Sequence, residues 1–151
     1  MIRKRVVASV FALGIGLPLT VGAASAQAAT YDNVDPSSTS CANSASTVSS
    51  ASIKTSSGQT LGQVELRYSS TCRTVWARVS GGGYKAAEAA GPTGKIVRNS
   101  DGKVLYLTHC NSDHSSCYSN MLNDAGVTSY AVGYNDSSAY GTVGPVRTAN
   151  Y

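Results

Sequence analysis

Residues 64–79 read VELRYSSTCRTVWARV, and this stretch decides the fold class. Apolar and polar residues alternate in both of its halves, and a short polar segment at residues 70–73 separates them. Because the side chains of a β-strand point alternately to opposite faces, the pattern predicts two strands, each with one apolar face. We expect a β-hairpin in which Val64 lies opposite Val79 and residues 70–73 form the loop.

This register also matches the residues on the other, outward face of the hairpin. It pairs Glu65 with Arg78, which carry opposite charges, and Arg67 with Trp76, which are a cation and an indole. Each cross-strand pair of these kinds contributes about 0.2–1 kcal/mol, and a slip by one residue would lose both. We therefore place Trp76 on the outward face beside Arg67, where the indole has no core to fill.

The rest of the chain predicts further short strands separated by turns. Asp101-Gly102 stands between two apolar runs, which is a strong hairpin signal because glycine adopts positive φ freely. Pro145 suits an edge strand or a bulge, since it has no backbone N–H to donate. Besides the central hairpin, the strands expected cover about residues 46–55, 96–97, 104–107, 127–134 and 140–151. The fold class is therefore all-β: a small disulfide-stapled antiparallel sandwich or partly closed barrel.

Residues 1–28 have the pattern of a secretory signal peptide. Three basic residues at positions 3–5 precede an apolar run over residues 6–21, and small residues follow at the cleavage positions. The apolar run is too short and too rich in glycine for a membrane span. We expect residues 29–40 to form an extended lead-in and residues 41–151 to form a single β domain.

Removal of this leader changes the charge of the chain. The full sequence has 12 basic and 8 acidic residues, and three of the basic ones lie in the leader, which leaves nine against eight, or +1. The apparent basic character therefore gives no support for a nucleic-acid partner. No later stretch is apolar enough to span a membrane. We predict a secreted, extracellular protein.

Four cysteines follow the leader, and an exported chain can join them as disulfides. Four cysteines allow three connectivities. Cys110 and Cys117 are close in sequence and flank a turn-forming segment, so we pair them, and we pair Cys41 with Cys72. By loop-closure entropy, the shorter bridge contributes roughly 2–3 kcal/mol and the longer one roughly 3–4 kcal/mol.

The outward face of the central hairpin is the candidate binding surface, with Trp76, Arg67, Arg78 and Glu65. The chain also carries nine tyrosines, which suit sugar stacking or protein contacts but can also fill a core that is short of Phe and Leu. The function predicted is a binding or structural module at the cell envelope or in the extracellular medium. Its partner would be a cell-wall glycan or another extracellular protein, and no cofactor is implied.

Two alternative functions depend on His109, Asp113 and His114. A hydrolase could use histidine with aspartate and one of the neighbouring serines, but the chain has no G-x-S-x-G motif. A metal site could use the same three side chains, but the spacing of the two histidines matches no named motif. The simpler interpretation is a polar loop held by the Cys110–Cys117 disulfide, and we name no catalytic residue or metal ligand.

Four stretches of the sequence resemble the YjfA-like family, domain of unknown function 2690. They are Asp35-Pro36, CANSASTV at residues 41–48, the hairpin at residues 64–79, and YSNM at residues 118–121. The most specific motif is ELRYS-x2-C-x3-WAR, and this chain differs from the family pattern in having no cysteine before Asp35. The resemblance implies an exported or envelope-attached protein of actinobacterial type and a Cys41–Cys72 pair. The family is biochemically uncharacterised, so the resemblance assigns no catalytic residue.

Overall fold

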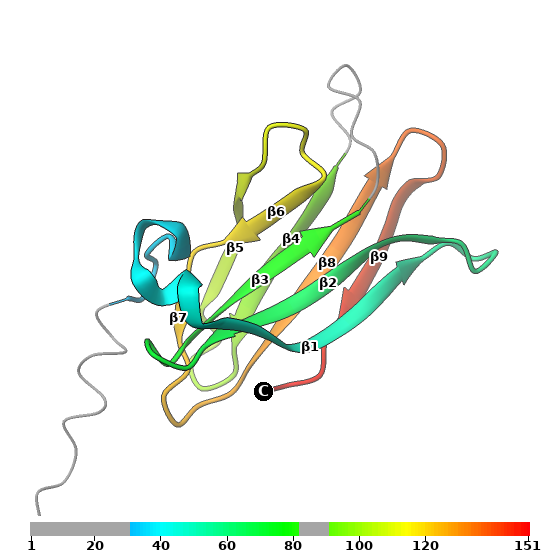
Figure 1. Ribbon diagram of the computed structural model, residues 1–151. Coiled ribbons are helices and arrows are strands. Elements are labelled where there is room, and N and C mark those ends of the chain that lie inside the picture. Colours follow the sequence, from blue (N-terminus) through cyan, green and yellow to red (C-terminus); the bar gives the residue numbers. More distant parts are fainter. Residues whose placement is uncertain (1–30, 82–90) are drawn as a thin grey trace, which may run out of the picture.

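The computed structural model describes residues 31–81 and 91–151, and the leader expected over residues 1–28 lies outside them (Figure 1). The described part of the chain is built from strands and two short 3-10 helices. In chain order these elements are η1 (Pro36–Ser38), η2 (Ser40–Ser44), β1 (Ala45–Lys54), β2 (Thr60–Ser69), β3 (Thr74–Ser80), β4 (Pro92–Arg98), β5 (Val104–Cys110), β6 (Ser116–Ser119), β7 (Leu122–Asn123), β8 (Ser129–Ser137) and β9 (Gly141–Arg147). No helix among these residues is long and apolar enough to cross a membrane.

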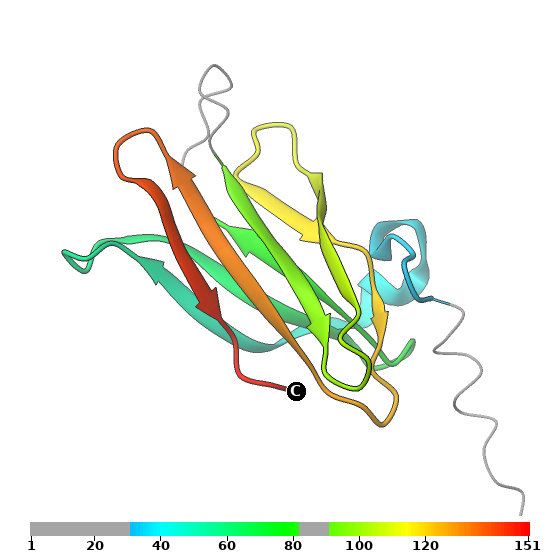
Figure 2. The same ribbon diagram turned by 180° about the vertical axis from the view of Figure 1, so that it is seen from behind.

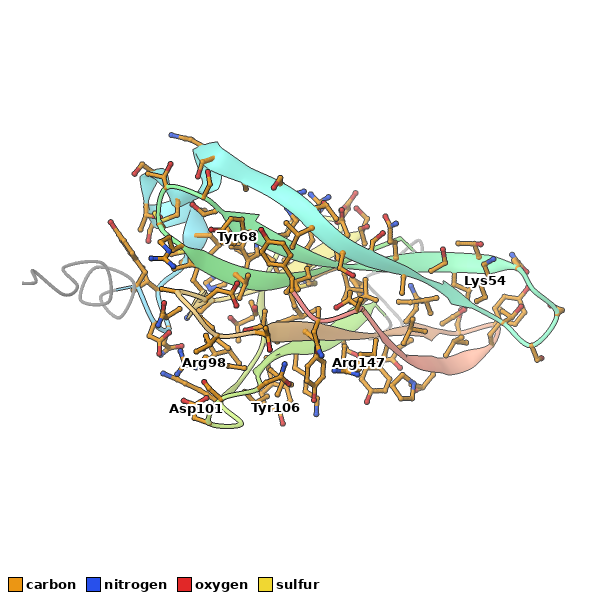
Figure 3. All side chains as sticks on the ribbon, turned by 90° about the horizontal axis from the view of Figure 1, so that it is seen from below. Lys54, Tyr68, Arg98, Asp101, Tyr106 and Arg147 are labelled. Carbon is orange, nitrogen blue, oxygen red and sulfur yellow. A yellow bond between two sulfur atoms is a disulfide. The ribbon has the colours of Figure 1, made fainter. Side chains whose placement is uncertain are left out.

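The strands form one antiparallel sheet that curls into a nearly closed barrel (Figures 1 and 2). Their order is β1-β2-β3-β6-β5-β4-β8-β9, and β7 pairs with β3. The two outer strands, β1 and β9, approach each other near the point where the Ala149 N–H donates to the Ser49 hydroxyl at 3.1 Å. Seen from below, β1 and β2 belong to one layer, and β4, β8 and β9 belong to the facing layer (Figure 3). The predicted all-β fold class is confirmed.

The central hairpin has the register that the sequence predicts. β2 and β3 pair Val64 with Val79, Glu65 with Arg78, and Arg67 with Trp76. Residues 70–73 form the loop, and Arg73 adopts a positive φ of 53° there. The alternation of apolar and polar residues was sufficient for this prediction because any shift by one residue would have turned the apolar set away from the core.

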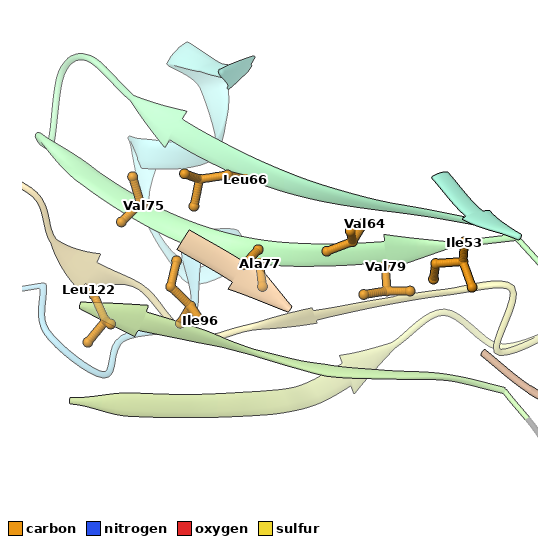
Figure 4. Close-up of a cluster of buried hydrophobic side chains, with 9 residues drawn as sticks. Ile53, Val64, Leu66, Val75, Ala77, Val79, Ile96 and Leu122 are labelled. Atoms are coloured by element: carbon orange, nitrogen blue, oxygen red, sulfur yellow. The ribbon is translucent and has the colours of Figure 1, made fainter. Parts of the chain in front are cut away.

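The inner face of this hairpin forms one wall of the main core (Figure 4). The opposite wall comes from β4 and β8, while β7 pairs with β3 and extends the wall of the hairpin. Nine side chains of this core are completely buried, and burial of an aliphatic side chain of this size contributes roughly 1.5–3 kcal/mol. They are Ile53, Val64, Leu66, Val75, Ala77, Val79, Ile96, Leu122 and Ala131.

Gly133 allows β8 to pass close beneath the hairpin. A Cβ atom at this position would lie 2.8 Å from the Cβ of Val64 and 2.9 Å from a methyl carbon of Val79. Carbon atoms do not approach so closely without displacement of the backbone or the neighbouring side chains. The spacing of the two layers therefore depends on the absence of a side chain at residue 133.

Two disulfides join the pairs of cysteines expected from the sequence. Cys41 is bonded to Cys72, 31 residues away, and Cys110 is bonded to Cys117, seven residues away. The second pair links two strands at the base of the turn that it closes, because β5 extends to Cys110 and Cys117 lies directly opposite on β6. The expectation of a polar loop after His109 is therefore correct only for the turn between these strands.

Residues 36–44 form two 3-10 helices instead of continuing an extended lead-in. Asp35 caps the first one, since its Oδ1 accepts a hydrogen bond from the Ser37 N–H at 2.8 Å, and Pro36 fixes φ at the first position. Thr39 caps the second, accepting from the Cys41 N–H at 3.1 Å. These turns direct the N-terminal segment back over the outer face of the central hairpin.

Candidate functional site

Trp76 points away from the main core, as the register predicts, but the prediction that nothing covers it is wrong. The residue is only 5% exposed. The N-terminal segment folds over the indole and forms a second, smaller apolar cluster with it. Cys41, Cys72 and Met121 are buried in this cluster, and the partly buried residues around them are Tyr31, Val34, Ala45 and Tyr118.

Backbone hydrogen bonds and the longer disulfide hold the N-terminal segment in place. The Asn33 N–H donates to the Met121 carbonyl at 2.8 Å, and the Met121 N–H donates to the Val34 carbonyl at 2.9 Å. The Cys41–Cys72 bond ties η2 to the loop of the central hairpin. The cover over Trp76 is therefore an integral part of the fold and is fixed at both of its ends.

Asp32 supplies a further anchor for this segment. Its carboxylate accepts from Arg98 Nη1 and Lys103 Nζ, each at 3.0 Å, and from the Asn123 N–H at 2.6 Å. Burial raises the pKa of Asp32, but the Asn123 N–H and the two cations outweigh it, so the pKa lies below its ordinary value. A charged Asp32 thus connects the start of the described chain to the β4–β5 hairpin.

The N-terminal segment covers only part of the outer face and leaves a pocket of about 220 Å³ beside Trp76. We call it the arginine pocket. Its floor comes from β2, β3 and β6, and its rim comes from the two 3-10 helices and the start of β1. The lining residues are Pro36, Ser37, Ala42, Ala45, Arg67, Trp76, Arg78 and Tyr118.

A buried carboxylate, Glu65, organises the two arginines of the pocket. Glu65 is 6% exposed, Arg78 Nε donates to its Oε2, and the Thr47 hydroxyl donates to its Oε1 at 2.8 Å. Arg67 Nη1 donates in turn to the Thr47 oxygen at 2.6 Å. Burial raises the pKa of Glu65, but the bonds from Arg78 and Thr47 outweigh it and hold the pKa below its ordinary value. Glu65 is therefore charged and balances one of the two guanidinium groups.

Within residues 31–81 and 91–151, the second guanidinium group, that of Arg67, forms no ion pair with a carboxylate. Burial and the positive charge of Arg78 lower the pKa of Arg67, and the negative charge of Glu65 offsets them only in part. In the described part of the chain, no hydrogen bond uses the terminal nitrogens Nη1 and Nη2 of Arg78, whose side chain is 39% exposed. These nitrogens form a planar pair of donors that fits a carboxylate or a phosphate. The pocket thus combines an excess positive charge with unused donors and aromatic walls.

Comparison with known proteins identifies the family. A sequence profile described as "Protein of unknown function (DUF2690)" matches residues 29–132, which is more than half of the chain. The chain belongs to the DUF2690 family. "Uncharacterized protein YjfA" of Bacillus subtilis (strain 168) is 35% identical over 122 residues, covering 73% of this chain and 74% of YjfA. No solved structure matches the chain.

The four stretches on which the resemblance to DUF2690 proteins rests all contribute to the arginine pocket. Asp35-Pro36 and residues 41–48 supply its rim, residues 64–79 supply both arginines and the indole, and residues 118–121 supply Tyr118. Sequence reasoning had named only the hairpin residues. Tyr118 was missed because pairing of β6 with β3, which puts it opposite Arg78, joins segments 40 residues apart. The sequence indicates a turn at Asp35-Pro36, but it does not indicate that this turn packs over the outer face of the central hairpin and lines the pocket.

The structure separates the residues of the predicted hydrolase or metal site. His109 lies opposite Tyr118 and stacks on its ring with centroids 5.1 Å apart, while its Nε2 is 2.7 Å from Asn120 Oδ1. Asp113 instead accepts from the Ser115 N–H within the β5–β6 turn, where His114 adopts a positive φ of 52°. Among the described residues, His109 Nδ1 lies 3.7 Å from Asp35 Oδ2 and makes no such contact with Asp113, and no cluster suited to a metal ion occurs.

Proposed function

We propose that this DUF2690 protein is an exported binding domain that recognises an anionic group through the arginine pocket. The observation that carries the proposal is the pair of guanidinium groups at one pocket, with Glu65 as the single carboxylate between them among the residues that the structure describes. A ligand carboxylate or phosphate would accept from Arg78 and would offset the charge repulsion between Arg78 and Arg67. The ligand would be a charged group of a cell-wall polymer or of another extracellular protein.

The size and rigidity of the pocket favour binding of one small group. A volume of about 220 Å³ accepts a carboxylate or phosphate with a few attached atoms, and not a complete polymer segment. Trp76 and the Cys41–Cys72 bond fix the pocket walls before any ligand arrives. Preorganised donors of this kind lose little side-chain freedom on binding, and a charge-assisted pair contributes roughly 1.5–3 kcal/mol.

Export is part of the same proposal. Residues 1–28 have the pattern of a signal peptide that would be removed, leaving a lead-in at residues 29–40 and a β domain at residues 41–151. Disulfides persist in oxidising compartments and are rare in the cytosol, so the two disulfides agree with this route. The expected location is the cell envelope or the surrounding medium.

Retention on purified peptidoglycan and on wall polysaccharide tests the binding site. Arg67→Gln removes one positive charge, and Arg78→Lys keeps the charge beside Glu65 but loses the planar pair of donors. We expect each variant to weaken retention about tenfold, which corresponds to about 1.4 kcal/mol. Lys54→Gln is the matched control, because it removes a positive charge from an exposed position at the far end of the same layer (Figure 3).

Thermal melts of each variant confirm beforehand that the domain is folded. Retention that survives both Arg67→Gln and Arg78→Lys in folded protein would reject the arginine pocket as the binding site. Release of soluble wall fragments by the wild type, lost in His109→Ala, would instead favour the hydrolase. Retention that falls as strongly in Lys54→Gln would show a diffuse charge effect and no specific pocket.

A further inference from the structure

The opposite layer of the barrel also carries an outward face rich in aromatic and basic side chains. Residues directly opposite each other in an antiparallel sheet project from the same face. Tyr106 on β5 pairs with Lys95 on β4, Lys95 pairs with Val132 on β8, and Val132 pairs with Arg147 on β9. One continuous row therefore crosses four strands. At about 4.8 Å between strands, this row spans roughly 14 Å.

Two more tyrosines flank this row on β8. Tyr130 and Tyr134 are each two residues from Val132, so both share its face. We call the surface made by Tyr106, Tyr130, Tyr134, Lys95 and Arg147 the tyrosine face. Figure 3 shows Tyr106 and Arg147 projecting from the same side of the lower layer, away from the core.

The tyrosine face is open and hollowed. Tyr106 is 65% exposed, the largest exposure of any bulky apolar or aromatic residue described. A hollow of about 350 Å³ lies beside it, lined by Thr93, Gly94, Lys95, Tyr106 and Tyr134. Gly94 lines this hollow with its backbone, because a side chain at this position would point inward at Val79. Exposed apolar patches rimmed by polar groups mark contact surfaces, and here Tyr106 and Tyr134 flank the hollow together with Lys95.

The charge of this face is positive. Lys95 and Arg147 form no ion pair within residues 31–81 and 91–151. The Arg147 guanidinium lies 3.8 Å from the centroid of the Tyr130 ring and donates to Asn150 Oδ1 at 2.6 Å. Asp136 is an acidic residue on the same face of β8, two residues beyond Tyr134. Its carboxylate accepts a hydrogen bond from the Thr142 hydroxyl at 2.6 Å.

We propose that the tyrosine face binds an acidic glycan, a chain of sugar rings that carries carboxylate or phosphate groups. The C–H faces of the sugar rings would pack on Tyr106 and Tyr134, and the acidic groups would pair with Lys95 and Arg147. The row across four strands suits an extended chain, in contrast to the single small group that fits the arginine pocket. This surface lies on the other layer of the barrel and is independent of the proposed pocket.

Native affinity electrophoresis in gels that contain a defined polymer tests this proposal. Polygalacturonate supplies carboxylates, purified teichoic acid supplies phosphates, and dextran is the neutral control. We expect at least one acidic polymer to retard the wild type and dextran not to do so. Tyr106→Ala and Lys95→Gln should each raise the apparent Kd about tenfold, and the more strongly retarding polymer identifies the acidic group.

Two control variants make the result specific. Tyr140→Ala removes another exposed tyrosine, 49% exposed, that lies outside the tyrosine face, and it should bind as the wild type does. Arg67→Gln alters only the arginine pocket, so Tyr106→Ala should raise the apparent Kd about tenfold in the Arg67→Gln background as well, and failure of one proposal does not affect the other. Retardation equal in dextran, or unchanged by Tyr106→Ala, would overturn the proposal. So would a wild-type dimer in sedimentation that Tyr106→Ala converts to monomer, since the face would then bind a second copy.

Discussion

Trp76 and Tyr106 occupy comparable places on the two layers of the barrel and have opposite surroundings. Each projects from the outward face of its strand, yet Trp76 is 5% exposed and Tyr106 is 65% exposed. The difference comes from residues 31–45, which fold over one layer and not over the other. Alternation along a strand thus determines which side chains share a face, but the exposure of that face depends on the rest of the chain.

Replacement of Trp76 should have the largest effect on stability. Trp76→Ala would leave a cavity between the central hairpin and the N-terminal segment, and truncation of a buried aromatic residue costs about 3–5 kcal/mol. Chemical denaturation followed by far-ultraviolet circular dichroism measures this loss. A loss below about 1 kcal/mol would show that the segment does not cover the indole in solution.

The two disulfides should differ in their contribution to stability. Replacing both Cys41 and Cys72 with alanine should cost roughly 3–4 kcal/mol, because this bond closes the longer loop and holds the cover over Trp76. The same change at Cys110 and Cys117 should cost roughly 2–3 kcal/mol. Urea denaturation of the two double variants compares them directly, and a larger loss for the shorter bridge would contradict this order.

The hairpin register and both disulfides could be predicted because they depend on local pattern and on a small number of possibilities. Any slip in pairing would have exposed Val64 and its apolar neighbours. The cover over Trp76 could not be predicted, since it depends on hydrogen bonds between Asn33 and Met121, which are far apart in sequence. The sequence therefore identified Arg67 and Arg78 as candidates but did not reveal the pocket that the cover creates around them.

Strand β6 was missed for a related reason. Its four residues, SCYS, carry little of the apolar alternation that signals a strand. Pairing with β3 and β5 on both sides stabilises it nonetheless. Tertiary pairing outweighs weak local preference at such positions, and Tyr118, which lines the arginine pocket, is located on this strand.

The free energy of unfolding should depend on pH because of two buried carboxyl groups, Glu65 and Asp124. Hydrogen bonds hold the pKa of Glu65 low, whereas burial raises the pKa of Asp124 to about 6, with Ser129, Arg73 and Arg98 only partly offsetting it. An unfolded aspartate has a pKa of about 3.9, so the folded chain binds more protons between about pH 4 and pH 6. The free energy of unfolding should therefore fall as the pH rises through this window, by an amount on the order of 1–3 kcal/mol.

Asp124→Asn keeps this position neutral at every pH and should remove that decline. Urea denaturation of the wild type and the variant at about pH 4.5 and about pH 7 isolates the contribution of Asp124. Asp32 does not affect this comparison between about pH 4.5 and about pH 7. Its pKa is lowered in the folded chain, so its contribution to the free energy of unfolding is lost only as the pH falls below this range. An equal decline in both proteins would show that Asp124 is ionised throughout.

Replacement of Tyr106 should have the smallest effect on stability. Tyr106→Ala removes a mostly exposed ring, and such surface changes usually alter the free energy of unfolding by less than about 0.5 kcal/mol. Its denaturation midpoint should match that of the wild type, in contrast to Trp76→Ala. A loss above about 1 kcal/mol would mean that the tyrosine face is covered in solution.

Fluorescence of Trp76 tests the arginine pocket most directly, because this residue is the only tryptophan in the chain and it lines the pocket. The wild type would be titrated with lysozyme-solubilised peptidoglycan and with soluble wall polysaccharide. We predict a saturable change in Trp76 emission that weakens as salt is added, weakens about tenfold in Arg78→Lys, and persists in Tyr106→Ala. No change in Trp76 emission with any of these polymers, or a change that Arg78→Lys leaves intact, would contradict the assignment of the arginine pocket as a binding site.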